Sequence, residues 1–185
     1  MSIPVPVSVT VLALLVVGLF WVMVRGWRAR TARTADLVPA LPDVPASLGT
    51  ARTAPVDVLY VTTTVARSWL ERVTAHGLGT RASARAQVFD TGVLVSRQGH
   101  RELFLPADAL RDVVRSSGMV GKFVGDESIV VVTWQPGTDR AALVDTGLRP
   151  VHENDRDLLQ SAVVALISPT PPSDPDSIIE PKEQK

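Results

Sequence analysis

The chain has 185 residues, a length that leaves room for one small domain with a hydrophobic core beside its terminal segments. Nineteen Lys and Arg residues balance nineteen Asp and Glu residues, so the overall charge predicts no nucleic-acid partner. The absence of cysteine excludes disulfides, thiolate metal sites and a cysteine nucleophile.

The first hydrophobic stretch, residues 5–24, contains no charged residue. Twenty residues in a helix extend over roughly 30 Å, which matches the hydrocarbon thickness of a bilayer. Residues 1–27 are therefore predicted to be a transmembrane anchor. The alternative is a cleaved signal peptide, which needs a basic start, a shorter apolar core and a small-residue cleavage site. The sequence around this stretch has none of these features.

A cluster of arginines follows the apolar stretch directly, and residues 1–35 contain no acidic residue. The cluster consists of Arg25, Arg28, Arg30 and Arg33. By the positive-inside rule it lies in the cytoplasm, which predicts a single-pass protein of the cell membrane with its N-terminus outside. Specific capture of anionic lipid is the alternative role for these four side chains.

Residues 28–55 are predicted to be a basic juxtamembrane and Pro-rich linker. Four prolines interrupt helix formation here and favour extended backbone, namely Pro39, Pro42, Pro45 and Pro55. As a flexible coil, residues 36–55 would reach on the order of 25 Å and act as a spacer between membrane and domain. The PxxP spacing leaves open a second role as a ligand for another protein.

Residues 56–167 carry the pattern of one folded domain. Residues 56–63 are rich in β-branched side chains and predict a strand, and residues 65–77 have apolar positions at helical spacing before Gly77. Short strands are then expected at residues 83–89, 93–97 and 101–105, linked by DTG and QGH turns.

The second half of the domain continues this pattern. A brief helical turn leads into an expected strand at 110–116, and the apolar run IVVVTW predicts a strand at 129–134 with a hairpin partner at 141–145. A helix capped by Asn154 or Asp155 is expected next, with an apolar face formed by Leu158, Leu159, Ala162, Val163 and Leu166. The polar, Pro-rich residues 168–185 are predicted to be a disordered tail.

The predicted fold class is mainly β with α. After the transmembrane helix, an antiparallel meander is closed by a C-terminal amphipathic helix, which is one way to protect the edges of a curled sheet. This order is typical of a pleckstrin-homology-like (PH-like) antiparallel β-barrel or sandwich capped by a C-terminal helix.

Several stretches also resemble one family, the actinobacterial PH-like-domain integral membrane proteins. The matching stretches are VLYVTTT (58–64), WLERVTAHGLGTRASA (69–84), VFDTGVLV (88–95), GKFVGDESIVVVTW (121–134) and DTGLRP (145–150). The resemblance implies one N-terminal span and one PH-like domain. It implies no biochemical activity and carries over no functional residue.

No motif for nucleotide binding, serine hydrolysis or zinc proteolysis is present in the sequence. The triplet D-T-G occurs at 90–92 and 145–147, which raises the possibility of an aspartic-protease dyad, but both copies are expected in hairpin turns. His76, His100 and His152 are widely separated. The chain is therefore predicted to be no enzyme and to hold no metal or cofactor.

Basic residues around the expected turns are the remaining candidates for a binding site. Arg81, Arg85, Arg97, Arg101 and Lys122 could contact an anionic headgroup or a partner through charge-assisted bonds. The alternative is a solvated face balanced by neighbouring acids.

The predicted function is a membrane-anchored PH-like interaction or scaffold module at the cytoplasmic face, without catalysis. Its expected partners are the membrane and a protein. The alternatives are an anionic-headgroup-binding module and an accessory subunit of an export or transport complex, which would need a multispanning partner because one helix encloses no pathway.

Overall fold

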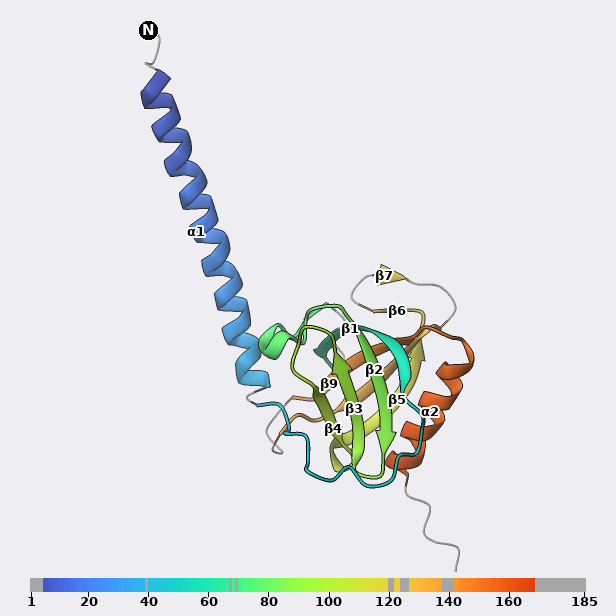
Figure 1. The fold of residues 1–185 in the computed structure, drawn as a ribbon. Coiled ribbons are helices and arrows are strands. Elements are labelled where there is room, and N and C mark those ends of the chain that lie inside the picture. Colours follow the sequence, from blue (N-terminus) through green and yellow to red (C-terminus); the bar gives the residue numbers. More distant parts are fainter. Residues whose placement is uncertain are drawn as a thin grey trace, which may run out of the picture.

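The computed structural model describes residues 5–38, 40–66, 68, 70–119, 122–123, 127–137 and 142–168 (Figure 1). A long helix precedes a strand-rich body that ends in a second helix. The elements in chain order are α1 (Val5–Leu37), β1 (Val56–Val65), η1 (Ala75–Gly77), β2 (Ala82–Phe89), β3 (Gly92–Arg97), β4 (Leu103–Pro106), η2 (Ala107–Ala109), β5 (Leu110–Ser116), β6 (Gly118–Met119), β7 (Lys122–Phe123), β8 (Ile129–Trp134), β9 (Val144–Pro150) and α2 (Asn154–Ile167).

Helix α1 contains the apolar stretch that the sequence predicts to cross a membrane. Its window Val9–Gly26 has a mean hydropathy of 2.2, and none of it is buried against the rest of the protein. Eighteen residues of helix are long and apolar enough to span a bilayer.

Seven strands form one antiparallel sheet in the order β4-β3-β2-β1-β9-β8-β5, which curls into a half-barrel. Helix α2 packs mainly on β5 and also touches β8, β2 and β9, so it covers the open side of the curl (Figure 1). The largest buried core side chains are Trp134, Tyr60, Leu78, Leu103, Leu105, Leu148 and Leu159. The predicted fold class, an apolar N-terminal helix followed by a PH-like body that is mainly β with α, is confirmed.

Strand β8 is apolar except at Thr133 because both of its faces are covered. Val130, Val132 and Trp134 belong to the main core. Ile129 and Val131 point to the other face, where they pack with Met119 of β6 and with Val61. A strand buried on both faces needs no polar alternation, which explains the apolar run IVVV at residues 129–132.

The predicted helix over residues 65–77 is wrong for the described part of that range. Strand β1 continues to Val65, and only residues 75–77 form a short 3-10 helix. The segment instead pairs with β1, because the Val73 amide donates to the Thr63 carbonyl at 2.9 Å and the Thr63 amide donates to the Leu78 carbonyl at 2.9 Å. Long-range backbone pairing has overridden the local helical spacing. Residues 67 and 69 lie outside the described residues.

The two D-T-G triplets have different surroundings. Residues 90–92 form the predicted turn between β2 and β3, whereas residues 145–147 lie inside β9 rather than in a turn. The Asp90 carboxylate bonds Arg52 and the Thr50 amide, and the Asp145 carboxylate accepts a bond from Thr133 at 2.7 Å. The two carboxylates therefore form no dyad. The hairpin partner of β8 is β9, which begins and ends later than predicted.

Helix α2 has the predicted position with a different start and a narrower apolar face. It begins at Asn154, and Glu153 at its N-cap makes no side-chain capping bond. Leu159, Val163 and Leu166 are buried, but Leu158 is 45% exposed. The predicted disordered tail lies outside the described residues, apart from residue 168.

The predicted linker is not a free spacer. Helix α1 continues through residues 28–37, and the following segment packs on the domain with Val38 and Leu41 buried. Residues 48–53 bond to β2 and the β2–β3 turn: the Arg52 amide donates to the Val88 carbonyl at 2.8 Å, and the Thr53 hydroxyl accepts from the Val88 amide at 3.1 Å. We call residues 40–55 the connector. Its prolines suit an extended strap across the domain as well as they suit a coil.

Candidate functional site

Arg97 lies inside the domain. Its side chain is 4% exposed, and the guanidinium donates to the carbonyls of Gly77 at 3.1 Å and Arg101 at 3.0 Å. It also stacks over the Tyr60 ring at 4.9 Å from the centroid. Burial lowers the pKa of the guanidinium, and the surrounding carbonyl dipoles and ring compensate the buried charge. Arg97 thus joins the β1–β2 and β3–β4 loops.

Tyr60 begins a line of hydrogen bonds across the core. Its hydroxyl donates to the Leu78 carbonyl at 2.7 Å and accepts from Thr63 Oγ1 at 2.6 Å. Thr63 in turn accepts from Thr146 at 2.9 Å, and Thr146 accepts from the Trp134 indole at 2.9 Å. The directions follow because the indole can only donate and the carbonyl can only accept. The line holds the loop before β2 against β1.

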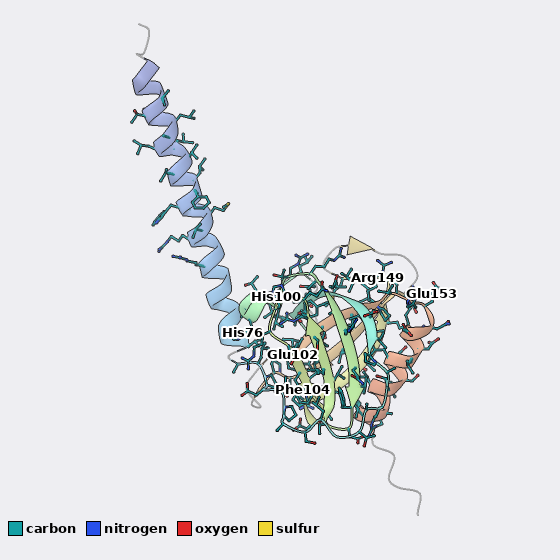
Figure 2. All side chains as sticks on the ribbon, in the orientation of Figure 1. His76, His100, Glu102, Phe104, Arg149 and Glu153 are labelled. Atoms are coloured by element: carbon teal, nitrogen blue, oxygen red, sulfur yellow. The ribbon has the colours of Figure 1, made fainter. Side chains whose placement is uncertain are left out.

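The same loop contacts the end of helix α1. His76 has a φ of 54°, a left-handed backbone, and its Nε2 donates to the Val38 carbonyl at 2.9 Å. Gly77, with φ 69°, sits against His100, since an added Cβ would lie 3.1 Å from His100 Nδ1. Figure 2 shows His76 and His100 beside the C-terminal end of α1. The β1–β2 loop is therefore bonded to Arg97 and Tyr60 on its inner side and to the end of helix α1 on its outer side.

The structure does not gather the five predicted basic residues into one anion site. Arg97 is internal, Arg85 pairs with Asp57 at 3.1 Å, and Arg101 pairs with Asp43 of the connector. Arg81 is exposed just before β2. Charge and turn position predict a five-residue site, but they do not take strand parity into account. Val93, Val95 and Arg97 alternate along β3, and that alternation could have shown that Arg97 points inward.

The remaining predicted cations lie elsewhere. Lys122 belongs to β7, and its side chain lies outside the description. In the arginine cluster, Arg25 and Arg28 are exposed on α1, with Arg25 over the Trp21 ring at 5.6 Å. The side chains of Arg30 and Arg33 lie outside the description.

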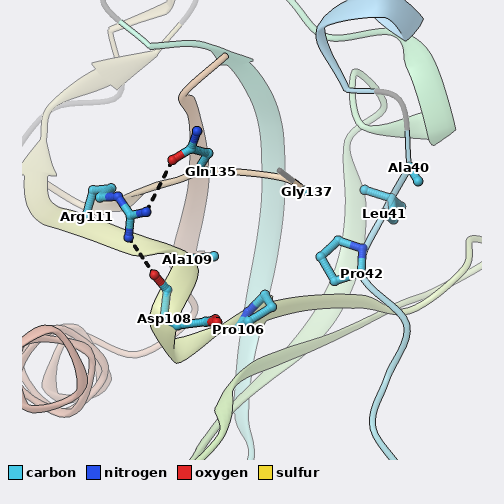
Figure 3. Close-up of a pocket in the computed structure, with 9 residues that line it drawn as sticks. All are labelled: Ala40, Leu41, Pro42, Pro106, Asp108, Ala109, Arg111, Gln135 and Gly137. Atoms are coloured by element: carbon cyan, nitrogen blue, oxygen red, sulfur yellow. Dashed lines mark hydrogen bonds between the residues drawn. The ribbon is translucent and has the colours of Figure 1, made fainter. Parts of the chain in front are cut away.

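A groove forms between the connector and the corner of the barrel where β4 passes into β5 (Figure 3). We call it the connector groove. Its volume is about 440 Å³, and its lining residues are Ala40, Leu41, Pro42, Pro106, Asp108, Ala109, Arg111, Gln135 and Gly137. The groove exists because the connector packs on the domain, and for that reason a reading of the connector as a spacer missed it.

Arg111 is the cation of the connector groove. Its guanidinium donates to the Asp108 carbonyl at 2.6 Å and to Gln135 Oε1 at 3.2 Å (Figure 3). It also donates to the Leu110 carbonyl at 3.0 Å. All three acceptors are neutral, and among the described residues Arg111 has no ion pair. A planar, positively charged group beside proline, alanine and leucine surfaces suits an extended chain that carries a carboxylate. The exposed Asp108 carboxylate, in the same groove, would disfavour a second acidic group.

A second hollow, of about 640 Å³, lies on the outer face of β1, β2 and β3. It is lined by two arginines and two carboxylates, namely Arg85 beside Asp57, together with Arg97 and Glu102. These charges compensate one another, so the hollow has no net attraction for an anion. Among the residues that the structure describes, no group of His, Asp and Glu side chains is arranged to hold a metal ion.

Tyr60 is the only tyrosine of the chain, so its titration can be observed directly. Burial raises its pKa to about 12. We expect tyrosinate absorbance of the folded protein to appear near pH 12 rather than near pH 10. The pKa of Tyr60 is higher in the folded protein than in the unfolded protein. The stabilising contribution of the protonated Tyr60 hydroxyl is therefore complete below about pH 10. It is lost as the pH rises toward 12, which lowers the free energy of unfolding by about 2–3 kcal/mol. Titration at the ordinary tyrosine pKa in folded protein would contradict this burial.

Replacement of Arg97 tests its internal role. Arg97→Met should lower the free energy of unfolding by about 2–4 kcal/mol, because the carbonyls of Gly77 and Arg101 lose their donor. The matched control Arg85→Met, at an exposed ion pair, should change it by less than about 1 kcal/mol. Urea unfolding of the full chain in detergent measures both. An Arg97→Met protein of unchanged stability would show that Arg97 is not a structural residue.

Comparison with known proteins agrees with this architecture. Residues 38–164 match the family model described as bacterial PH domain-like, which is more than half of the chain. The match begins where α1 ends and so includes the connector as part of the domain. A search of the curated proteins found no match. The chain belongs to the bacterial PH domain-like family.

Proposed function

We propose that the protein is a membrane-anchored interaction module, held at the cytoplasmic face of the cell membrane by α1. The apolar window Val9–Gly26 supports the anchor. The arginines that follow it support an orientation with the N-terminus outside. PH-like domains are generally non-catalytic, which favours a scaffold or interaction role over an enzyme.

The observation that carries this proposal is the fixed junction between helix and domain. Helix α1 runs unbroken to Leu37, Val38 is fully buried, and His76 bonds the Val38 carbonyl. The connector then packs across the domain instead of hanging free. A domain presented at a set position beside a membrane suits assembly with another protein of that membrane.

The connector groove is the proposed contact site for this partner. Its apolar rim and Arg111 fit an extended segment with one Asp or Glu side chain or a C-terminal carboxylate. The connector forms one wall of the groove and follows α1 directly. A membrane protein with a short cytoplasmic segment could therefore reach the groove. An export or transport complex would be one such partner.

Headgroup binding through the predicted basic residues is the weaker alternative. It would have to proceed without Arg97, and with Arg85 and Arg101 released from their aspartates. Only Arg81 among the described members of that set is exposed without an ion pair.

Sidedness can be measured with single cysteines because the native chain has none. Ser2→Cys and Ser177→Cys each receive a membrane-impermeant maleimide in intact cells, with lysed cells as the labelling control. We expect labelling at Ser2→Cys and protection at Ser177→Cys. The reverse pattern would place the domain outside the cytoplasm.

Crosslinking tests the groove. A photo-reactive amino acid replaces Ala40 in the groove or Ala165 on α2, both of which are exposed. We expect a protein adduct in native membranes from the Ala40 position only. Arg111→Glu should reduce it at least about tenfold, corresponding to a loss of roughly 1.4 kcal/mol or more, whereas the charge-matched control Arg81→Glu should not. An adduct that survives Arg111→Glu would contradict the groove as the contact site.

A further inference from the structure

Helix α2 ends on the side of the domain that carries the connector groove. Its N-terminal half bonds the end of β5, where Arg115 Nε donates to Gln160 Oε1 at 2.7 Å. From there α2 runs back along β5 toward its start and contacts η2, the element that precedes β5. Two residues of η2, Asp108 and Ala109, line the groove. The chain that follows α2, residues 169–185, therefore starts one element away from the groove; we call these residues the tail.

The tail is long enough to reach the groove. From Ser168 to Ile178 the chain advances ten residues, and four of them are prolines that favour extended backbone. At about 3.1 Å per residue this length covers about 30 Å. A compact body formed by residues 38–168 has a radius of gyration of about 14 Å and a diameter of about 36 Å. Ile178 can therefore be placed in a groove that lies on the same side of the domain as the end of α2.

The tail carries one short apolar motif. Apart from its prolines, its only large apolar side chains are Ile178 and Ile179, and Glu180 follows them directly. The groove offers the matching surfaces, since Figure 3 shows Pro42 on one side of it and Arg111 on the other. Two isoleucines against the proline and alanine surfaces would be removed from water, and the next residue would bring a carboxylate to the guanidinium.

The charges of the motif complement those of the groove. The groove presents Arg111 and the exposed Asp108 carboxylate, and neither has an ion pair among the described residues. The tail presents Glu180 and Lys182 on either side of Pro181. Two residues apart in an extended chain, these side chains point to the same side. Glu180 on Arg111 therefore brings Lys182 toward Asp108, the one group of the groove that disfavours a second acid.

We infer that residues 178–182 of the chain's own tail occupy the connector groove, with Glu180 on Arg111, and compete there with the partner segment. The docking stands on the groove and the tail alone, whereas the competition rests on the proposed function. A tethered segment has an effective concentration of about 1 mM. One exposed ion pair and two isoleucines give an affinity on the order of 1 mM, so the groove is about half occupied. A partner that binds in the micromolar range displaces the tail.

Crosslinking in the purified full chain, in detergent and without a partner, tests the docking. A photo-reactive amino acid replaces Ala40 in the groove or, as the matched control, the exposed Ser83 in the second hollow. Cleavage before aspartate releases residues 176–185 as one peptide. We expect an adduct of this peptide within one chain, at least about threefold stronger from Ala40 than from Ser83. No adduct, or equal adducts from both positions, would overturn the inference, as would an adduct that joins two copies of the chain.

Charge substitutions in the tail test the pairing without altering the folded domain. Glu180→Arg should lower the adduct within the chain about fivefold, the effect of a tenfold weaker affinity on a half-occupied site. Asp174→Arg makes the same change of charge outside the motif and should leave the adduct unchanged. Adding Arg111→Glu to Glu180→Arg should restore the adduct. Equal losses from Glu180→Arg and Asp174→Arg would show a general charge effect and contradict the pairing of Glu180 with Arg111.

The same variants in native membranes test the competition. Glu180→Arg should raise the protein adduct from the Ala40 position by up to about twofold, because the tail no longer fills part of the grooves. An unchanged or lower protein adduct would contradict competition. A protein adduct without an adduct to the tail would overturn this inference and retain the proposed function. An adduct to the tail without any protein adduct would retain the docking and overturn the groove as a partner site.

Discussion

The buried guanidinium of Arg97 is the interaction on which the arrangement of this protein depends. A charge in a β-barrel interior is unfavourable unless dipoles or a partner compensate it. Here two carbonyls and the face of Tyr60 do so. Those carbonyls belong to the β1–β2 and β3–β4 loops, so the solvation of one side chain requires both loops to close over the core. A neutral side chain of similar volume would impose no such geometry.

The β1–β2 loop, which Arg97 and Tyr60 fix in place, also contacts the C-terminal end of helix α1. Residues 75–78 receive bonds from Arg97 and Tyr60 on the inside and present His76 to Val38 on the outside. The junction of α1 with the domain is thus an extension of the core. The connector groove follows from it, because the groove requires the connector to leave α1 across the barrel corner.

The comparison of Arg97 with Arg111 shows what a charge pattern can indicate. Both are single arginines next to a turn, and the sequence alone assigned the first to a binding surface and passed over the second. In the fold the first is enclosed by backbone carbonyls and the second faces a groove. Strand alternation could have corrected the first assignment. The second depends on the packing of the connector some seventy residues earlier in the chain, which no local pattern describes.

The elements that depend on local patterns can be predicted from the sequence alone. The apolar window of α1, the strands with turn residues between them and the periodic face of α2 follow from length, alternation and helical spacing. The conformation of residues 65–77, the course of the connector and the inward direction of Arg97 depend instead on tertiary contacts. In each case a backbone or side-chain group found its hydrogen-bond partner far away in the sequence. Such pairings outweigh local propensity because an unpaired polar group inside the domain costs more than a lost turn of helix.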